Sequence, residues 1–276
     1  MSQNFERALA FLRERNTGVS KLNGKSFGEV IDEFVWYGDE TGFQACSGEL
    51  KIVGDTDIPK HERRTADSRV SASFYRLGNA KGQEGPNIFM PPGKYRKAAF
   101  TDAFLEEHGA PPGSTIVMTP NGYMTEEAWI EASPKIAAGI RALIDKHNPD
   151  WWALKVVDGY IPHTTSLEAM EVYEKKKILL LKEEADTSQV NQTYDQAKAK
   201  EDKKNMREAA SWLRSARSLN LGVLDGWALV LVGLHAIRES SPQVWVQSAI
   251  RVNLHPLHRV PFEQWCERIA PFLQGG

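Results

Sequence analysis

Residues 34–43 read FVWYGDETGF. The apolar run over 34–37 is followed directly by a glycine and two acidic residues. Aromatic and β-branched residues are typical of strands, so the run is predicted to be a buried strand ending at Gly38-Asp39. A second stretch has the same design, because residues 151–157 read WWALKVV and Asp158 follows directly. Open α/β sheets bind their ligands just beyond the carboxyl ends of strands. Two carboxylates in such places indicate a site at one edge of a sheet.

The rest of the chain alternates between strand and helix patterns. Further strands are expected over 43–45, 51–53, 69–77, 87–90, 114–119 and 178–181, the last of them fully buried. Helices are expected over 5–15, 100–108, 166–175 and 194–218, with one that opens at Thr125 as its N-cap and a separate one over 134–147. This order predicts a mixed α/β fold with a late parallel strand–helix–strand unit, and a C-terminal part that is wholly helical.

Composition limits the classes of protein that the chain can represent. It has 276 residues, enough for one large domain or two small ones. Lys and Arg number 34 against 36 Asp and Glu, which excludes a uniformly basic coat for nucleic acid but not a local basic patch. Two cysteines, Cys46 and Cys266, fit a reducing compartment and cannot form a disulfide scaffold. The longest apolar run, 227–234, is too short for a bilayer, so no membrane partner is expected.

A third carboxylate extends the acidic pattern. Asp195 follows the polar loop that comes after the strand predicted over 178–181. Carboxylate oxygens suit Mg²⁺ or Mn²⁺ rather than zinc, and three of them can hold two ions about 4 Å apart for phosphoryl transfer. On spacing alone, turn and N-cap roles are the favoured explanation for such residues. His255, His258 and Cys266 match no zinc-finger spacing and lack a fourth ligand.

Five short motifs occur in an order that resembles one family, over about residues 34–204. Residues 38–43 (GDETGF) resemble the MDETGF signature of DDE-superfamily transposases, the pogo/Tigger-like enzymes related to mariner elements and to centromere-binding proteins. The other matches are 85–89 (GPNIF) to PPIFVFKG, 120–125 (PNGYMT) to SPSGWMT, 157–159 (VDG) with His163 to DGHxSH, and 192–195 (QTYD) to QPLD.

The resemblance implies an RNase H-like mixed sheet flanked by helices, with the catalytic and metal-binding acids Asp39, Asp158 and Asp195 and two Mg²⁺ or Mn²⁺ ions. The loop before Asp195 departs from the family pattern, so Asp186 or Glu184 remain alternatives for the third acid. Tyr160 stands where the family usually has histidine. Supporting roles fall to three further residues: Glu40, expected on the opposite strand face from Asp39, His163 and Gln192.

The same resemblance implies DNA as the partner. Candidate phosphate contacts are Arg63, Arg64, Lys94, Arg96 and Lys97. Fewer than forty residues precede Asp39, which leaves no room for the family's helix-turn-helix modules. We therefore expect a catalytic fragment, a truncated element copy, or a protein that depends on a separate DNA-recognition subunit.

The expected organisation is an N-terminal helical lead-in over 1–33, the catalytic domain over 34–205 and a helical extension over 206–276. This extension is expected to pack as a bundle on the catalytic core or to form a homodimer contact. A nuclear location is expected, or a cytoplasmic one for a prokaryotic or inactive protein. The predicted activity is metal-dependent DNA cleavage, with transfer of 3′-OH ends to target DNA as a further step. The alternative is a catalytically inactive, transposon-derived DNA-binding or assembly protein.

Overall fold

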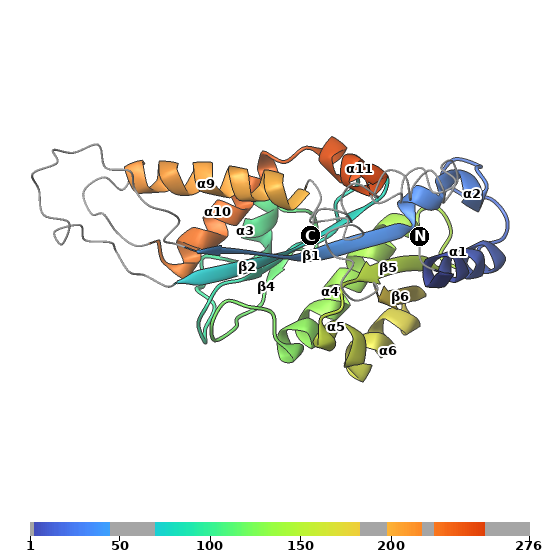
Figure 1. Ribbon diagram of the computed structural model, residues 1–276, viewed down its shortest axis with the longest axis horizontal. Helices are drawn as coiled ribbons and strands as arrows, with labels where there is room; N and C mark the ends of the chain where they lie inside the picture. The colour runs from blue at the N-terminus through green and yellow to red at the C-terminus, as the bar shows by residue number, and fades with distance from the viewer. Residues whose placement is uncertain (1–2, 45–69, 183–197, 217–223, 252–276) are drawn as a thin grey trace, which may run out of the picture.

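The computed structural model describes residues 3–44, 70–182, 198–216 and 224–251. A six-stranded mixed sheet lies at its centre, with strand order β4-β3-β2-β1-β5-β6 (Figure 1). The strands are β1 (Val35–Gln44), β2 (Ser71–Asn79), β3 (Ile88–Met90), β4 (Thr115–Ile116), β5 (Ala153–Val157) and β6 (Ile178–Lys182).

Strand directions define the fold class. The first three strands form an antiparallel meander, whereas β5 and β6 run parallel to β1 on its other side. A meander whose first strand is followed across the sheet by parallel strands is the RNase H-like arrangement, with β4 added beside β3. The predicted α/β class, the RNase H-like sheet and the late parallel strand–helix–strand unit are confirmed.

Helices cover both faces of this sheet (Figure 1). One face carries α4 (Glu126–Ile144) and α6 (Leu167–Lys175), and the other carries α9 (Lys198–Ala216), α10 (Gly226–Arg238) and α11 (Pro242–Arg251). The remaining helices are α1 (Gln3–Arg15), α2 (Phe27–Val30), the 3₁₀ turn η1 (Ile31–Glu33), α3 (Asp102–Glu107) and α5 (Ile161–Thr165). Among the described helices, none combines the length and the apolar character that crossing a bilayer requires.

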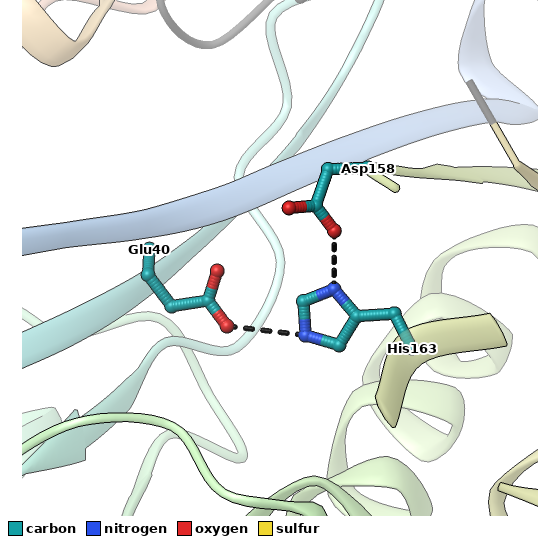
Figure 2. Close-up of side chains that lie close together, drawn as sticks. All are labelled: Glu40, Asp158 and His163. Atoms are coloured by element: carbon teal, nitrogen blue, oxygen red, sulfur yellow. Dashed lines mark hydrogen bonds and ion pairs between the residues drawn. The ribbon is translucent and has the colours of Figure 1, made fainter. Parts of the chain in front are cut away.

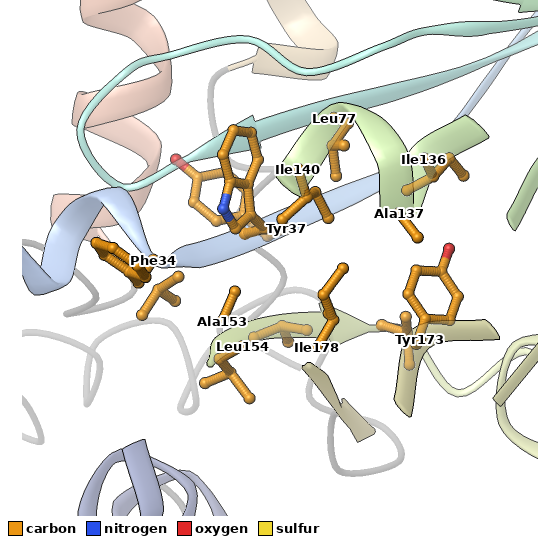
Figure 3. Packing of buried hydrophobic residues seen from close by; sticks show 14 of the residues in the cluster. Phe34, Tyr37, Leu77, Ile136, Ala137, Ile140, Ala153, Leu154, Tyr173 and Ile178 are labelled. Carbon is orange, nitrogen blue, oxygen red and sulfur yellow. The ribbon is translucent and has the colours of Figure 1, made fainter. Parts of the chain in front are cut away.

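The alternation of side chains along β2 separates the two layers. Tyr75 packs against Trp129 of α4, while a Cβ added to Gly233 of α10 would collide with the ring of Phe74. Every residue of β2 is buried, because helices cover the strand from both sides. Figure 3 shows part of this core, where Ile136 and Ile140 of α4 meet residues of the sheet such as Leu77.

Several expectations about elements need correction or qualification. The helix expected to start at Pro134 is the second half of α4, which begins after the predicted N-cap Thr125 and continues through the proline. Proline removes only one backbone hydrogen bond, and the apolar face on either side of it is buried. The strand over 178–181 is not fully buried, because β6 is at the edge of the sheet. The strand expected to end at Gly38-Asp39 continues to Gln44 as β1 and includes the strand expected at 43–45, because β1 pairs with β2 from Trp36 to Gln44; residues 51–53 lie outside the described residues.

A buried ionic network ties α9 to the sheet. Arg76 of β2 lies 2.8 Å from Glu84 and 3.7 Å from Asp202 of α9, and Lys198 is 3.5 Å from Asp202 and 2.8 Å from Glu201. Burial opposes ionisation of Glu84, but the charges of Arg76 and Lys198 outweigh it and lower the pKa of that carboxyl. Lys198 therefore belongs to the interior and not to a solvated helix face. The expected boundary between residues 205 and 206 lies inside α9.

Candidate active site

Three polar side chains meet beyond the end of β5: Glu40, Asp158 and His163 (Figure 2). His163 lies between the two carboxylates, with Nδ1 2.5 Å from Asp158 Oδ1 and Nε2 3.1 Å from Glu40 Oε1. One potential ligand atom from each residue lies within 4.8 Å of the others. A carboxylate from β1 and one from the end of β5 therefore converge through a buried imidazole.

The sheet register brings these residues together. Tyr37 of β1 pairs with Val156 in the parallel β1–β5 ladder. Glu40 and Asp158 therefore both lie past the same end of the segment over which β1 and β5 pair. A Cβ added to Gly38 would collide with the backbone oxygen of Arg76, so glycine is needed at this position. The strand that contains Asp39 and the strand that precedes Asp158 are therefore neighbours in one mixed sheet.

The imidazole of His163, a residue of α5, is held by aromatic rings as well as by the two carboxylates. Its ring centroid lies 4.2 Å from that of Trp129 and 6.3 Å from that of Tyr75. Burial lowers the pKa of His163, but its hydrogen bonds with Asp158 and Glu40 outweigh burial and raise that pKa above its ordinary value. An imidazolium in this place compensates the negative charge of the two acids.

The pKa values of the two carboxylates in contact with His163 are lowered. Burial works against ionisation in both, and contact with the His163 imidazole outweighs it in Glu40 and in Asp158. Both acids therefore keep their charge at neutral pH, which is the form that can bind a cation.

Asp39 is the neighbour of Glu40 in β1, and its carboxyl interacts with those of Glu40 and Asp158. It is the cross-strand partner of Arg76, whereas Glu40 is the partner of Tyr75, so the two neighbouring acids alternate in direction as strand geometry requires. The Glu40 amide donates to Asp39 Oδ1 at 2.8 Å. Burial, followed by hydrogen bonding to Glu40 and the charges of Glu40 and Asp158, raises the pKa of Asp39 to about 10. Three carboxylates that interact so strongly favour either protonation or a bound cation.

A buried lysine lies behind the cluster. Lys155 of β5 is fully buried, donates to the Tyr75 hydroxyl at 2.7 Å and lies over the rings of Tyr75, Trp129 and Tyr173. Burial lowers the pKa of Lys155 to about 7, although the charges of Glu40, Asp158 and Asp39 favour its protonated form. Sequence reasoning missed this residue. The signal was a single lysine inside an otherwise apolar strand, a position that lysine rarely occupies without a partner.

Without a divalent ion, the protein is expected to lose stability as pH rises from 5 to 7. The folded-state pKa of Asp39 lies above its unfolded value, so its contribution is complete below pH 4 and declines up to about pH 10. The raised pKa of His163 acts in the same direction from its ordinary value upward. Lys155, whose pKa is lowered, offsets the loss only above about pH 7.

Urea unfolding with a chelator at several pH values measures this slope, which reaches at most about 1.4 kcal/mol per pH unit for each proton. Asp39→Asn should flatten it, because the amide cannot lose a proton. An unchanged slope in that variant would contradict the assignment to Asp39.

The other predicted site residues either lie outside the described residues or do not contact this cluster. Asp195, Gln192, Arg63, Arg64 and the alternative acids Asp186 and Glu184 lie outside the described residues. Arg96 contacts the Phe100 carbonyl and pairs with Asp102 at 2.8 Å, and Lys97 pairs with Asp225 at 3.3 Å. Lys94 lies over the adjacent ring of Tyr95. The described members of the basic set are thus engaged with their own surroundings and none is brought into contact with the acidic cluster.

The donor set fits a divalent cation. Carboxylate oxygens suit Mg²⁺ and Mn²⁺, and a single imidazole nitrogen is compatible with Mn²⁺. One potential ligand atom from each of Glu40, Asp158 and His163 lies within 4.8 Å of the others, a spacing that one ion can bridge. Fold and site together define an RNase H-like α/β domain with an acidic site between the middle of β1 and the end of β5.

Comparison with known proteins gives structural similarity at low sequence identity. The chain is similar to the Mos1 strand transfer complex (TM-score 0.47, 11% identity, 97% of this chain and 59% of that chain) and to a pre-cleavage Mos1 transpososome (0.48, 11%, 97% and 61%). A Mos1 mariner paired-end complex with Mn gives a TM-score of 0.44 at 10% identity, over 97% and 60%. The chain thus spans about 60% of the length of these transposase chains. No protein-family model matches it, and no curated protein matches its sequence.

Proposed function

We propose that the protein is a metal-dependent DNA endonuclease of the DDE transposase type. One observation carries the proposal: the carboxylates of Glu40 and Asp158 converge on His163 beyond the same edge of two neighbouring parallel strands, next to Asp39. The five sequence motifs support the same conclusion, since the first contains Asp39 and Glu40 and the fourth contains Asp158 and His163.

In this proposal each acid has a distinct role. Asp158 and Asp39 would hold the divalent ions, Mg²⁺ or Mn²⁺, with Asp195 completing the set, and Glu40 would offer a further oxygen beside Asp158. Bound there, such ions would supply stabilisation of the charge that develops on the reacting oxygens. His163 orients Asp158 through the 2.5 Å hydrogen bond, in the way that second partners of metal ligands commonly do.

The first reaction is hydrolysis of one DNA phosphodiester. A water oxygen forms a bond to phosphorus while the bond from phosphorus to the 3′ oxygen breaks, and the 3′ oxygen takes up a proton. The products are a 3′-hydroxyl and a 5′-phosphate. In a second step the 3′ oxygen of the freed hydroxyl forms a bond to a phosphorus of target DNA while the bond from that phosphorus to its own 3′ oxygen breaks, and the released 3′ oxygen takes up the proton. This transfer of ends is proposed for the complete assembly with its recognition subunit or second copy.

Nicking of supercoiled plasmid tests this proposal. The wild-type chain should convert supercoiled to nicked circles with Mg²⁺ or Mn²⁺ and not with a chelator, and the nicks should be extended by a DNA polymerase because they carry 3′-hydroxyls. A chain that binds plasmid but leaves it intact with both ions would refute the enzyme. It would support the alternative of an inactive, transposon-derived DNA-binding protein.

A further inference from the structure

An exposed tyrosine stands beside the acidic cluster with its ring fixed in place. Tyr160 precedes α5 and is 41% exposed, although its hydroxyl donates to the Met124 carbonyl at 3.1 Å. Its ring meets His163 edge-on, with centroids 5.2 Å apart and planes at 83°. The tyrosine is thus held at its hydroxyl and against His163, while a large part of the side chain remains open to solvent.

A lysine that pairs with no acid among the described residues lies at the end of the neighbouring strand. Lys182 is the last residue of β6 and the register partner of Val157. Its Cε lies 3.8 Å from the position that a Cβ on Gly159 would take, so its stem packs on the residue between Asp158 and Tyr160. Lys182 is exposed and forms no ion pair with any residue in the described ranges. It differs in this respect from Arg96 and Lys97, which are both paired.

We propose that Tyr160 and Lys182 form a subsite for one unpaired nucleotide of a single-stranded nucleic acid. The base stacks on the exposed part of the Tyr160 ring, and a backbone phosphate contacts the Lys182 ammonium. Stacking on an aromatic ring tolerates every base but requires that the base be unpaired, which selects single strands or frayed ends over intact duplex. A ring already fixed through Met124 loses little conformational freedom on binding.

The position of this subsite extends the proposed function. The subsite rests on that function, because the proposed function is what identifies the neighbouring phosphate. A nucleotide held on either side of Gly159 lies next to Asp158, so it would flank the bond to be cut. Binding itself needs no catalysis, and this separates the two proposals experimentally.

The test is fluorescence anisotropy of a short labelled single-stranded DNA over a salt series, with a chelator present so that cleavage plays no part. Tyr160→Ala should weaken binding by about 5- to 100-fold with an unchanged salt slope. Tyr160→Phe, which keeps the ring, should lose less. Lys182→Ala should reduce the slope of log K against log salt by about 0.7, the value for one phosphate contact on a single strand.

Two variants serve as matched controls. Tyr95→Ala removes another exposed tyrosine, and Lys146→Ala removes an exposed lysine that precedes β5 at the other end of that strand. Both should bind as wild type does. Photocrosslinking with 5-bromodeoxyuridine in the oligonucleotide should label Tyr160.

Three results would overturn the subsite: no binding by the wild type, equal effects of Lys182→Ala and Lys146→Ala, or a Tyr160→Ala variant that binds normally. Normal plasmid nicking together with any of these would leave the endonuclease standing without this subsite. If the expected binding pattern is found but the wild type does not nick plasmid, the subsite is supported and the proposed endonuclease activity is refuted.

Discussion

Asp158→Asn is expected to reduce divalent-dependent DNA cleavage by at least about 10³-fold. Metal ions contribute several kcal/mol of charge stabilisation in such reactions, and each 1.4 kcal/mol is a factor of ten in rate. Asparagine has nearly the same shape and keeps an oxygen that accepts the hydrogen bond from His163 Nδ1. The fold should therefore persist, while the negative charge that binds the cation is lost.

The plasmid assay should be accompanied by thermal melts with and without Mn²⁺. A ligand at a hundred times its Kd stabilises the folded state by about 2.7 kcal/mol, and Asp158→Asn should lose this gain. Asp150→Asn is the matched control, because Asp150 is an exposed acid that pairs with Lys177 at 2.8 Å before β5 begins. Equal cleavage by the Asp158 variant and this control would show that Asp158 has no part in the chemistry.

Arg76→Met is expected to cost about 3–5 kcal/mol of folding stability. Removing one member of a buried ionic network leaves its partners as uncompensated charges in the interior. Arg76 is 1% exposed, Asp202 is fully buried, and Glu84 is the second acid that would lose its neighbour. Asp202→Asn added to Arg76→Met should recover part of the loss, because it removes one of the stranded charges.

Urea unfolding measures both variants against an exposed pair. Lys175→Met breaks the ion pair with Glu171, whose side chains are 74% and 63% exposed, and should cost less than about 1 kcal/mol. An Arg76→Met variant as stable as Lys175→Met would mean that solvent reaches the network and that it does not anchor α9.

Local patterns in the sequence predicted the fold well where an element depends only on residues close together in the chain. The apolar runs before Asp39 and Asp158 indicated two buried strands, and Thr125 indicated a helix start, because these features depend on neighbours in the chain. Pro134 misled the helix prediction, since tertiary packing of α4 compensates the missing hydrogen bond. The exposure of β6 was not visible either, because strand order and not composition decides which strand lies at an edge.

The candidate site was only partly visible in the sequence. Motif resemblance pointed to Asp158 and His163, and the structure places them in contact. Glu40 was given only a supporting role on the opposite face from Asp39, yet it is the acid of β1 that meets His163. Which of two adjacent acids faces the cluster depends on the register of β1 with β2. The aromatic surroundings of Lys155 depend likewise on three elements distant in sequence, β2, α4 and α6.

The central claim is that a divalent ion binds where β1 and β5 present their acids. Anomalous diffraction at the manganese edge from crystals soaked in Mn²⁺ tests it most directly. We expect a peak within coordination distance, about 2.0–2.3 Å, of an Asp158 oxygen, shared with a carboxylate of Asp39 or Glu40. Crystals of Asp158→Asn should lack that peak. A well-ordered site with no anomalous peak near Asp158 in the wild type would contradict the claim.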